Sequence, residues 1–461
     1  MRFKRIHLVG IGGSGMSALA EHLIEAGVAV SGSDRASSAT TDSLRRLGAR
    51  VFDTHDEKNL PPDADVVVRS AAVPDDNPEV AAARRLGLKV VKYAEMLGEL
   101  TAANKSVCVS GCHGKTTTSS MLAHVFMRCG LDPGFMIGGV VAGVNRSSRV
   151  GRGEYFVAEA CEYDRSFHRL RPHVAVITNI DADHLDYYRD IDEIEESFRV
   201  FVSLVPAESG LVVVNGEDPR ALRAAASSGR KYVKFALSDP ADGTADWTAV
   251  EPGSDAAGIS FRALNRGTDL GLFRSAIYGL HNVKNALATL AVCDFYGLPL
   301  ESVRAAILDF PGVGRRLEAV GEANGMPVFD DYGHHPTEIG SVISAARSRW
   351  PGRKVWFVFQ PHQHARTKLM MDAFAEVLHR ADMTILVDIY AARDTEADKK
   401  TVHSKQLAHR LAERGAGVVY CASFAEAAEY ARRNAGPDKV LITLGAGNVW
   451  KVGRMVAGMS T

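Results

Sequence analysis

Residues 106–118 read Ser-Val-Cys-Val-Ser-Gly-Cys-His-Gly-Lys-Thr-Thr-Thr, a short apolar strand followed by a glycine-bounded turn, a lysine and three threonines. Glycines let a backbone wrap closely around a phosphate, and the first amides of the following helix point at the anion. Lys115 adds positive charge, and Thr116 can bind Mg²⁺. The turn is shorter than a standard phosphate loop, because Val109 stands where G-x-x-x-x-G-K-[ST] needs glycine. We expect a phosphate-binding strand-turn-helix unit, with an incidental glycine turn as the less favoured alternative.

The segment around this loop alternates between strands and helices. After the loop, the apolar residues Met121, Leu122, Val125 and Phe126 fall on one helical face, and Gly130 suits the helix end. Strands are expected at 155–158, 174–178 and 211–215, with a helix at 283–296. The segment 238–268 is rich in Gly, Asp, Ser and Pro and predicts turns with short strands. This rhythm indicates a parallel, doubly wound α/β sheet.

The N-terminal hundred residues form a similar unit. A strand at 6–9 leads into Gly10-Ile11-Gly12-Gly13-Ser14-Gly15, which is followed by a helix at 16–25 and a strand at 28–30. Further strands are expected at 66–68 and 88–91. The glycine turn and Asp34, about twenty residues on, match a dinucleotide fingerprint. The helix N-terminus can equally accept the diphosphate of a nucleotide sugar, and a tight turn without a ligand is the third alternative.

A third α/β unit follows the pattern break at 310–314. Its strands are expected at 328–329, 355–359, 383–387, 418–419 and 440–444, separated by segments of helical length. The polar stretch 101–105 suits a linker between the first two units. We therefore predict an α/β fold of three domains: 1–103, Rossmann-like; 104–318, with the phosphate loop; and 319–461, again Rossmann-like.

Composition excludes several classes of protein. The 461 residues suffice for two or three domains, and the 46% hydrophobic content argues against disorder. Lys plus Arg total 54 against 55 Asp plus Glu, so no basic excess indicates a nucleic-acid binder. No apolar run reaches the roughly 20 residues that span a bilayer. The six cysteines are scattered, which favours reduced thiols in the cytoplasm over disulfides or a zinc site.

Polar residues follow the predicted strands of the middle segment. Glu159 ends the strand at 155–158, and His184 follows the strand at 174–178 after a short loop. Carboxyl ends of parallel strands face ligands, so both can lie near the phosphate loop and hold a metal ion, although solvated loop residues are an equal alternative. The choice of carboxylate stays open, because acidic neighbours are close in sequence: Glu162, Asp164, Asp181, Asp183 and Asp186.

The third unit carries a dense titratable motif, Asp330-Asp331-Tyr332-Gly333-His334-His335-Pro336, before a helix expected at Thr337. Capping can explain Thr337 but does not explain the paired histidines, so we favour a ligand-facing loop over a structural one. Arg315, Arg316 and Arg366 are candidates for phosphate or carboxylate recognition, with plain surface arginines as an equal alternative.

Six motifs in this order resemble the Mur ligase family of peptidoglycan synthesis over essentially the whole chain. They are residues 7–16, 111–118, 179–184, 281–286, 330–337 and 445–448. The resemblance implies an N-terminal domain for a UDP-sugar, a central ATPase domain and a C-terminal domain that closes on the site. The first glycine turn then becomes a diphosphate site for the nucleotide sugar.

The resemblance also implies roles for individual residues. The catalytic residues would be Lys115, Glu159 and His184, and the metal ligands Thr116, Glu159 and His184. ATP would contact Gly111, Cys112, His113, Gly114, Lys115, Thr116, Thr117, Asn282, Asn285, Arg316 and Asp331. The UDP-sugar or the amino acid would contact Gly12, Gly13, Ser14, Gly15, Asp34, Ser70, His334, His335 and Arg366.

The implied reaction uses ATP and Mg²⁺. The γ-phosphoryl group moves to the lactyl carboxylate of UDP-N-acetylmuramate, and the amine of L-alanine attacks the acyl phosphate. Several family members use a carbamylated lysine after the histidine loop, residues 179–184 here, but residues 187–202 contain no lysine, which favours the alanine-adding branch. Cys112 stands where the family commonly has threonine, a change expected to matter little. We expect a cytoplasmic monomer or weak homodimer without nucleic-acid or membrane partners, in which Lys115→Ala abolishes turnover and leaves the fold intact.

Three rival readings stay open at this point. A dinucleotide-dependent oxidoreductase explains only the first hundred residues. A non-catalytic nucleotide-binding regulator predicts no amino-acid-dependent ADP release. A related ligase that attaches a preformed tripeptide to the same sugar nucleotide shares the ATP site, and is expected to differ in the N-terminal glycine turn.

Overall fold

The computed structural model describes residues 3–185, 187–237, 245–392 and 394–460. Asp186 and residues 238–244 of the predicted turn-rich segment lie outside them. The chain divides into two compact units. The first contains Met1–Thr248, Leu264–Asp269 and Asn285–Phe310; the second contains Ala249–Ala263, Leu270–Lys284 and Pro311–Thr461. Each unit is described by itself.

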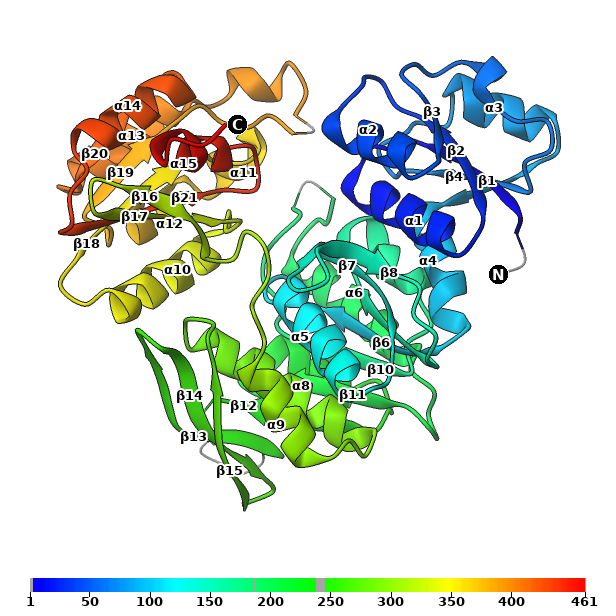
Figure 1. Cartoon of the computed structure of the whole chain (residues 1–461), viewed down its shortest axis with the longest axis horizontal. Coiled ribbons are helices and arrows are strands. Elements are labelled where there is room, and N and C mark those ends of the chain that lie inside the picture. Colours follow the sequence, from blue (N-terminus) through cyan, green and yellow to red (C-terminus); the bar gives the residue numbers. More distant parts are fainter. Residues whose placement is uncertain (1–2, 186, 238–244, 393, 461) are drawn as a thin grey trace. The chain divides into compact units, whose positions relative to one another are not determined.

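The first unit begins with a five-stranded parallel sheet in the order β3-β2-β1-β4-β5 (Figure 1). The triple valine of β4 is fully buried, as expected for a sheet covered on both faces. Its elements are β1 (Arg5–Val9), α1 (Ser14–Glu25), β2 (Ala29–Ser33), α2 (Ala39–Arg46), β3 (Arg50–Phe52), η1 (Glu57–Asn59), β4 (Val66–Arg69), α3 (Pro78–Arg85), β5 (Lys89–Lys92) and α4 (Tyr93–Ala102). The predicted β-turn-α-β rhythm of this segment is confirmed.

A ten-stranded sheet follows, in the order β15-β14-β13-β12-β11-β10-β6-β9-β7-β8, and most residues of β13, β14 and β15 are assigned to the second unit. Strand β6, which leads into the phosphate loop, lies parallel between β9 and β10. The elements are β6 (Lys105–Ser110), α5 (Lys115–Arg128), β7 (Gly134–Val141), β8 (Arg146–Arg149), β9 (Tyr155–Glu159), η2 (Tyr163–Arg169), β10 (Val174–Ile177), α6 (Ile191–Ser203), β11 (Leu211–Asn215), α7 (Pro219–Ala226), β12 (Tyr232–Ala236), β13 (Trp247–Asp255), β14 (Gly258–Asn265), β15 (Thr268–Ser275), α8 (His281–Phe295) and α9 (Leu300–Leu308).

Two predictions for this region need correction. The stretch 101–105 is not a free polar linker, because α4 continues to Ala102 and β6 already starts at Lys105. The short strands expected in 238–268 are strands of eight or nine residues in β13–β15. Phe261 and Phe273 on β14 and β15 stack at 5.6 Å between ring centroids. This apolar contact stabilises strands whose glycine and aspartate content weakened the prediction.

The C-terminal part of the second unit is a six-stranded sheet in the order β16-β17-β21-β18-β19-β20, parallel except for β16 (Figure 1). Buried apolar clusters cover both faces. The elements are β16 (Glu318–Ala323), β17 (Met326–Asp331), α10 (Pro336–Arg349), β18 (Lys354–Phe359), α11 (His364–Leu369), α12 (Met371–Leu378), β19 (Met383–Leu386), η3 (Asp398–Lys400), α13 (Ser404–Glu413), β20 (Val418–Tyr420), α14 (Phe424–Arg433), β21 (Lys439–Leu444) and α15 (Trp450–Val456). The predicted α/β fold with three sheet-centred parts is confirmed.

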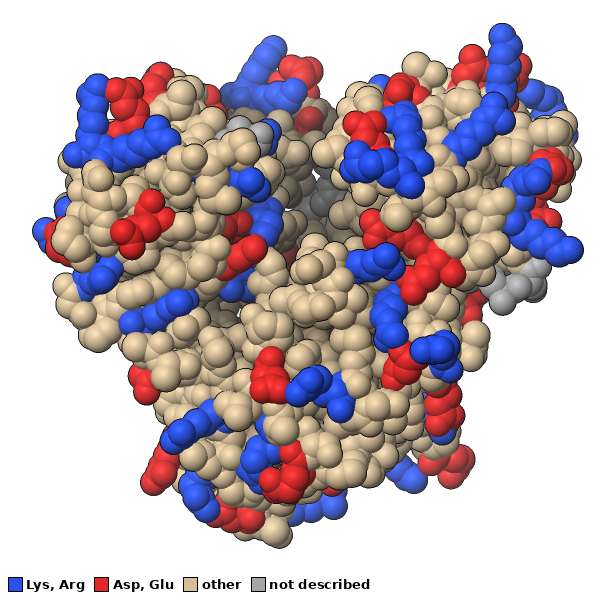
Figure 2. Space-filling view, viewed as in Figure 1, with Lys and Arg blue, Asp and Glu red and all other residues tan. Residues whose placement is uncertain are grey.

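Charges of both signs alternate over the face shown in Figure 2, in agreement with the balanced composition. Within the described ranges, no helix combines the length and apolar character needed to cross a bilayer.

Candidate active site

The phosphate loop leaves β6 at Ser110 and enters α5 at Lys115. Gly111 has φ +138°, and a Cβ on it would overlap the Thr178 hydroxyl. Gly114 has φ +83° and lies beside Asn285, whose Oδ1 would be 3.0 Å from an added Cβ. Both glycines are therefore required by backbone conformation and by space. Asn285, predicted to contact the nucleotide, is next to this turn.

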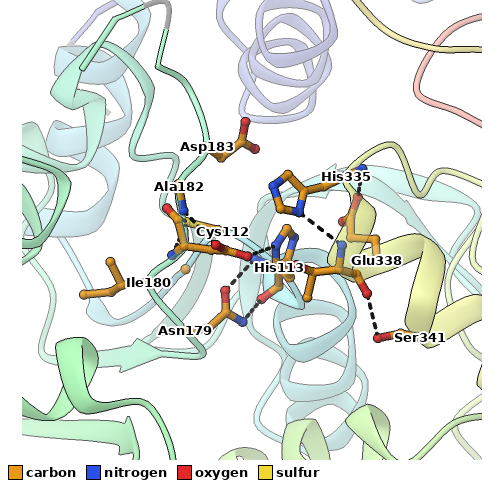
Figure 3. Close-up of polar contacts among 12 residues, drawn as sticks. Cys112, His113, Asn179, Ile180, Ala182, Asp183, His335, Glu338 and Ser341 are labelled. Carbon is orange, nitrogen blue, oxygen red and sulfur yellow. Dashed lines mark hydrogen bonds and ion pairs between the residues drawn. The ribbon is translucent and has the colours of Figure 1, made fainter. Parts of the chain in front are cut away.

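The end of β10 clamps the loop through the backbone of His113 (Figure 3). Thr178 Oγ1 donates to the His113 carbonyl at 2.5 Å, and Asn179 Nδ2 donates to the same oxygen at 2.9 Å. The His113 amide donates back to Asn179 Oδ1 at 2.9 Å. These bonds fix the loop backbone, which is the part that meets a phosphate. Thr178 has no recognisable motif, so sequence reasoning did not assign it this role.

Cys112 also joins the phosphate loop to the histidine loop (Figure 3). Its thiol donates to the Asp181 carbonyl at 3.2 Å and lies 3.1 Å from the Asp181 amide nitrogen. Burial raises the pKa of the thiol well above its ordinary value, so the group is neutral. The side chain of Cys112 was expected to matter little because the loop binds phosphate through its backbone amides. In the structure this side chain also connects the two loops.

The Lys115 ammonium group contacts three oxygens of the chain. Nζ donates to the carbonyls of Gly111 at 2.5 Å and Cys112 at 3.3 Å, and to Glu162 Oε1 at 3.0 Å. Burial alone would lower the pKa of Lys115, but the negative charge of Glu162 and its neighbours raises the pKa overall, so the lysine stays protonated. A fixed positive charge therefore lies at the N-terminus of α5.

Thr116 and Glu159 come together beside the lysine. Thr116 Oγ1 donates to Glu159 Oε2 at 3.0 Å, and the Gly138 amide of β7 donates to the same oxygen at 2.9 Å. A hydroxyl and a carboxylate are the hard oxygen ligands that Mg²⁺ prefers. Thr116 and Glu159 stay predicted metal ligands together with His184, whereas Gly138 had no sequence signal.

His184 lies beside Glu162, the acidic neighbour that the sequence could not select. Its Nε2 is 3.7 Å from Glu162 Oε1 and 3.9 Å from Asp183 Oδ2. The backbone of His184 has φ +56°, uncommon for a non-glycine residue, and its amide donates to Asp183 Oδ1 at 2.7 Å. Held strain of this kind is frequent at functional sites.

The N-terminal glycine turn is closed by Asp34. The Gly12 amide donates to Asp34 Oδ2 at 2.8 Å, and the Gly13 amide donates to the Gly10 carbonyl at 3.2 Å. The predicted ligand residue Asp34 thus stabilises the turn itself. The turn precedes α1, which begins at Ser14, and Ser70 follows β4 with its Cβ 3.2 Å from where a Gly10 Cβ would lie. Asp34 and Ser70 stay predicted contacts of the UDP-sugar.

The glycine turn and the phosphate-loop region meet at Tyr93, the first residue of α4. A Cβ on Gly15 would lie 3.1 Å from the Tyr93 ring, and Tyr93 OH donates to Met136 Sδ of β7 at 3.3 Å. A cavity of about 460 Å³ lies between the start of α4 and η2. It is lined by Lys92, Ala94, Asp164, Arg165, Ser166, His168, Arg169 and Tyr187.

The second unit contains the remaining predicted nucleotide residues. Asp331 ends β17, and its carboxylate accepts from the Gly333 amide at 2.8 Å and the Leu317 amide at 2.9 Å. Burial raises the pKa of Asp331 to about 6, although Arg316 opposes this shift. Arg316 lies 3.5 Å from Glu338. Asn282 donates to the Tyr278 carbonyl at 2.7 Å at the start of α8.

His335 has a structural role that the interpretation of the paired histidines did not include, and its predicted contact with the UDP-sugar or the amino acid stays a prediction. Its imidazole accepts from the Thr337 amide and forms a capping box with Glu338, so it caps α10. The sequence carried part of this signal, with Pro336 at the first helical position and Glu338 three residues after the cap. Histidine is not among the favoured capping residues, which hid the pattern.

The other predicted ligand residues of this unit form a small basic cluster. The rings of His334 and His362 are 5.6 Å apart, and Arg366 Nη1 lies 3.3 Å from His362 Nδ1. His362 stacks on Tyr390. His334 and Arg366 therefore lie close together, and His362 joins them although it was not selected from the sequence.

A phosphate loop at the carboxyl edge of a parallel sheet, with a lysine, a hydroxyl, two carboxylates and an imidazole around it, defines a P-loop enzyme of phosphoryl transfer. Family models match three consecutive segments of the chain. They are "Mur ligase family, catalytic domain" at 5–105, "Mur ligase middle domain" at 109–293 and "Mur ligase, glutamate ligase domain" at 315–447. The chain belongs to the Mur ligase family.

Curated relatives match over nearly the full length. A UDP-N-acetylmuramate–L-alanine ligase of Acetivibrio thermocellus is 41% identical over 98% of this chain and 96% of its own. The ligase of the same name from Geobacter sulfurreducens is 40% identical, with 98% and 96% covered.

Solved structures agree in fold. The UDP-N-acetylmuramate-alanine ligase of Thermotoga maritima matches with a TM-score of 0.83 at 27% identity, covering 98% of each chain. A murein peptide ligase from Psychrobacter arcticus matches with a TM-score of 0.72 at 24% identity, also covering 98% of each chain.

Proposed function

We propose that this chain is an ADP-forming ligase of peptidoglycan synthesis that joins L-alanine to the lactyl carboxylate of UDP-N-acetylmuramate. The observation that carries the proposal is the lysine-threonine-carboxylate arrangement on the phosphate loop, in a chain 41% identical to a UDP-N-acetylmuramate–L-alanine ligase over 98% of its length. ATP is the phosphoryl donor in this family.

The phosphate loop would bind ATP through its backbone amides and Lys115. The carboxylate of the sugar attacks the γ-phosphorus, so an oxygen–phosphorus bond forms, the bond to the β-phosphate oxygen breaks, and ADP leaves. The amine of L-alanine then attacks the acyl carbon, loses a proton and releases phosphate as the amide forms. Lys115 contributes by placing positive charge where the transferring phosphoryl group carries negative charge.

The residues also fit a magnesium ion, since Thr116 and Glu159 offer oxygen ligands in contact with each other. A bound Mg²⁺ would neutralise phosphate charge and align the γ-phosphoryl group. Gly138 would keep the Glu159 carboxylate oriented through its amide.

We further propose that the sugar nucleotide places its diphosphate on the glycine turn at Gly12–Gly15 and its sugar toward the phosphate loop. Tyr93 contacts both the turn and Met136, and the cavity between the start of α4 and η2 is lined by Arg169 and by the ion pair of Lys92 with Asp164. The two substrates would then meet at the carboxyl end of β6. His334 and Arg366 stay predicted contacts of the amino acid or the muramate, and the domain limits at 103 and 318, the cytoplasmic location and a monomeric or weakly dimeric state stay predictions.

The test is ADP release with UDP-N-acetylmuramate and a panel of amino acids, together with the preformed tripeptide of the stem. L-alanine should give the highest kcat/KM, with glycine and L-serine lower but measurable, because an alanine side chain offers few contacts for discrimination. Release that depends only on the tripeptide would establish the recycling ligase instead. Tight NAD(H) binding without sugar-nucleotide binding would contradict the proposal altogether.

A further inference from the structure

A fully buried carboxylate lies beside the five-stranded sheet, outside the groups assigned to the reaction above. Glu79, in the first turn of α3, has no exposed surface and no lysine or arginine partner among the described residues. Oε1 accepts from Asn59 Nδ2 at 2.8 Å and from the Asp56 amide at 3.2 Å. Oε2 accepts from Ser33 Oγ at 2.5 Å, and His7 Nε2 lies 3.4 Å away. Four polar groups from three other segments of the chain therefore hold one carboxylate.

The carboxylate of Glu79 is ionised. Burial alone would raise its pKa, but the hydrogen bonds from His7, Ser33 and Asn59 lower the pKa overall. Hydrogen bonds to an ionised acceptor are about twice as strong as those between neutral groups. Because the single hydroxyl proton of Ser33 goes to the carboxylate, Ser33 Oγ must accept from His55 Nδ1, which lies 2.8 Å away. The side chain of Ser33 is therefore fixed from two sides.

Ser33 joins this carboxylate to the glycine turn. It is the last residue of β2, and its carbonyl oxygen accepts from the amides of Gly10 at 2.8 Å and Ile11 at 2.9 Å. The next residue, Asp34, accepts from the Gly12 amide at 2.8 Å. These two neighbouring residues thus bind the amides at the beginning of the turn. Within the described ranges α1 has no side-chain cap at its N-terminus, so the amides that follow the turn are open to an anion.

We infer that Glu79 is a positioning residue of the sugar-nucleotide site, which holds the glycine turn through Ser33 in the conformation that receives the diphosphate. The inference rests on the proposed binding of a UDP-sugar at this turn. An apolar side chain of similar volume would fill the place of Glu79 without the cost of burying a charge. It would not orient Ser33, and the turn would lose the anchor of its first amides.

The test measures the binding of UDP-N-acetylmuramate, and of UDP alone, to the full-length chain by isothermal titration calorimetry. Glu79→Gln keeps the size of the side chain and removes its charge. The dissociation constants of both ligands should rise about tenfold, the effect of losing one charge-assisted hydrogen bond. Affinity for a nonhydrolysable ATP analogue should stay unchanged, because the phosphate loop is built on the other sheet of this unit. In turnover, KM for the sugar nucleotide should rise by the same factor, with kcat at saturating substrates unchanged.

Ser33→Ala cuts the connection and leaves the other three contacts of Glu79 in place, so it should weaken the binding of both ligands to the same extent. The double variant should bind no more weakly than Ser33→Ala, because Glu79 then has no route to the turn. Asp65→Asn is the matched control. Asp65 holds the other end of β1 by accepting from the amides of Lys4 at 2.6 Å and Arg5 at 2.8 Å, and its substitution should leave the affinity for both ligands unchanged.

Wild-type affinity for UDP in Glu79→Gln would overturn the inference. If that variant does not fold, Ser33→Ala decides alone, and wild-type affinity in Ser33→Ala would refute the connection. An equal loss of affinity in Asp65→Asn, or an equal loss for the ATP analogue in Glu79→Gln, would also overturn it, because general weakening of the fold would then explain the effect.

These readouts separate the inference from the proposed function. If the wild type releases ADP with L-alanine while KM for the sugar nucleotide does not depend on Glu79, the ligase proposal stands and the inference is refuted. If sugar-nucleotide binding depends on Glu79 but no amino acid stimulates ADP release, the inference stands and the proposed reaction fails. A wild type that binds no sugar nucleotide would overturn both.

Discussion

Removing the ammonium group of Lys115 should impair both stability and turnover, for different reasons. In Lys115→Ala the carboxylate of Glu162, 2% exposed, loses its close cation. Breaking a buried ion pair by deleting one partner costs about 3–5 kcal/mol. A typical stability of about 5–15 kcal/mol leaves the chain folded but weakened. We therefore expect Lys115→Ala to keep the fold but with a lower free energy of unfolding. Loss of turnover is still expected, because the contact between the lysine and the phosphates is gone.

The double variant Lys115→Ala/Glu162→Gln separates the two effects. Without the orphaned carboxylate, at least about half of the lost stability should return, a coupling within the range measured for contacting residues. Turnover should not return, since glutamine at 162 supplies no positive charge to the phosphates. Recovery of stability without recovery of activity is the specific expectation.

Urea unfolding followed by circular dichroism measures the first effect, with each transition fitted separately, and ADP release measures the second. Lys105→Ala and Lys105→Ala/Glu154→Gln are the controls, because that ion pair is exposed at 48% and 58%. Little change is expected in either control. The reasoning is refuted if Lys115→Ala is no less stable than Lys105→Ala, or if the double variant stays as unstable as the single one.

Three further changes test other parts of the site. Gly111→Ala should cost about 1–3 kcal/mol and abolish binding of an ATP analogue in calorimetry, because its Cβ overlaps Thr178, whereas Gly130→Ala, with nothing within 4 Å of its Cβ, should retain binding. Analogue affinity should fall as the pH drops through about 6, since protonation of Asp331 removes an acceptor from its two amide bonds, and Asp331→Asn should flatten this dependence. Because the folded pKa of Asp331 is raised, this group contributes more stability to the fold as the pH falls over that interval. Thermal unfolding of the wild type near pH 5 should therefore show a folded protein, which excludes acid unfolding through Asp331 as the cause of the lower analogue affinity. His335→Ala should lower stability by about 1 kcal/mol through loss of the α10 cap, and His335→Asn should restore most of it in the same urea assay.

The order of strands and helices could be predicted from the sequence because apolar periodicity and glycine turns act locally. The strand at Leu211–Asn215 was expected with the bounds that the structure has, and the other strands expected at stated positions differ by one to three residues at an end. Strands β3, β7, β8, β12 and β16 were not expected from the sequence. The exceptions are segments where tertiary contacts override local preference. Strands β13–β15 are longer than their turn-rich composition indicated, since partners across the sheet satisfy their backbone groups.

The site was predictable to the level of segments but not of individual carboxylates. Glu159 is the last residue of β9 and Glu162 comes three residues later, so sequence position alone does not show which of them serves the site. The structure separates them through their partners, since Glu159 accepts from Thr116 and Glu162 pairs with Lys115. Glu162 is also held by Tyr188, whose hydroxyl donates to the Glu162 carbonyl, and this contact between distant segments is not present in local sequence.

The strand order itself explains why distant motifs form one site. Strand β6 lies between β9 and β10, with Val109 paired to Glu159 on one side and Ser110 paired to Ile177 on the other. The carboxylates at and just beyond the end of β9 and the loop that follows β10 must therefore lie on either side of the phosphate loop. Thr178 and Asn179 bind the backbone of His113, so the phosphate loop cannot shift unless the segment after β10 shifts with it. Substitutions at the end of β10 should consequently weaken nucleotide binding as strongly as substitutions within the phosphate loop, because both determine the same backbone conformation.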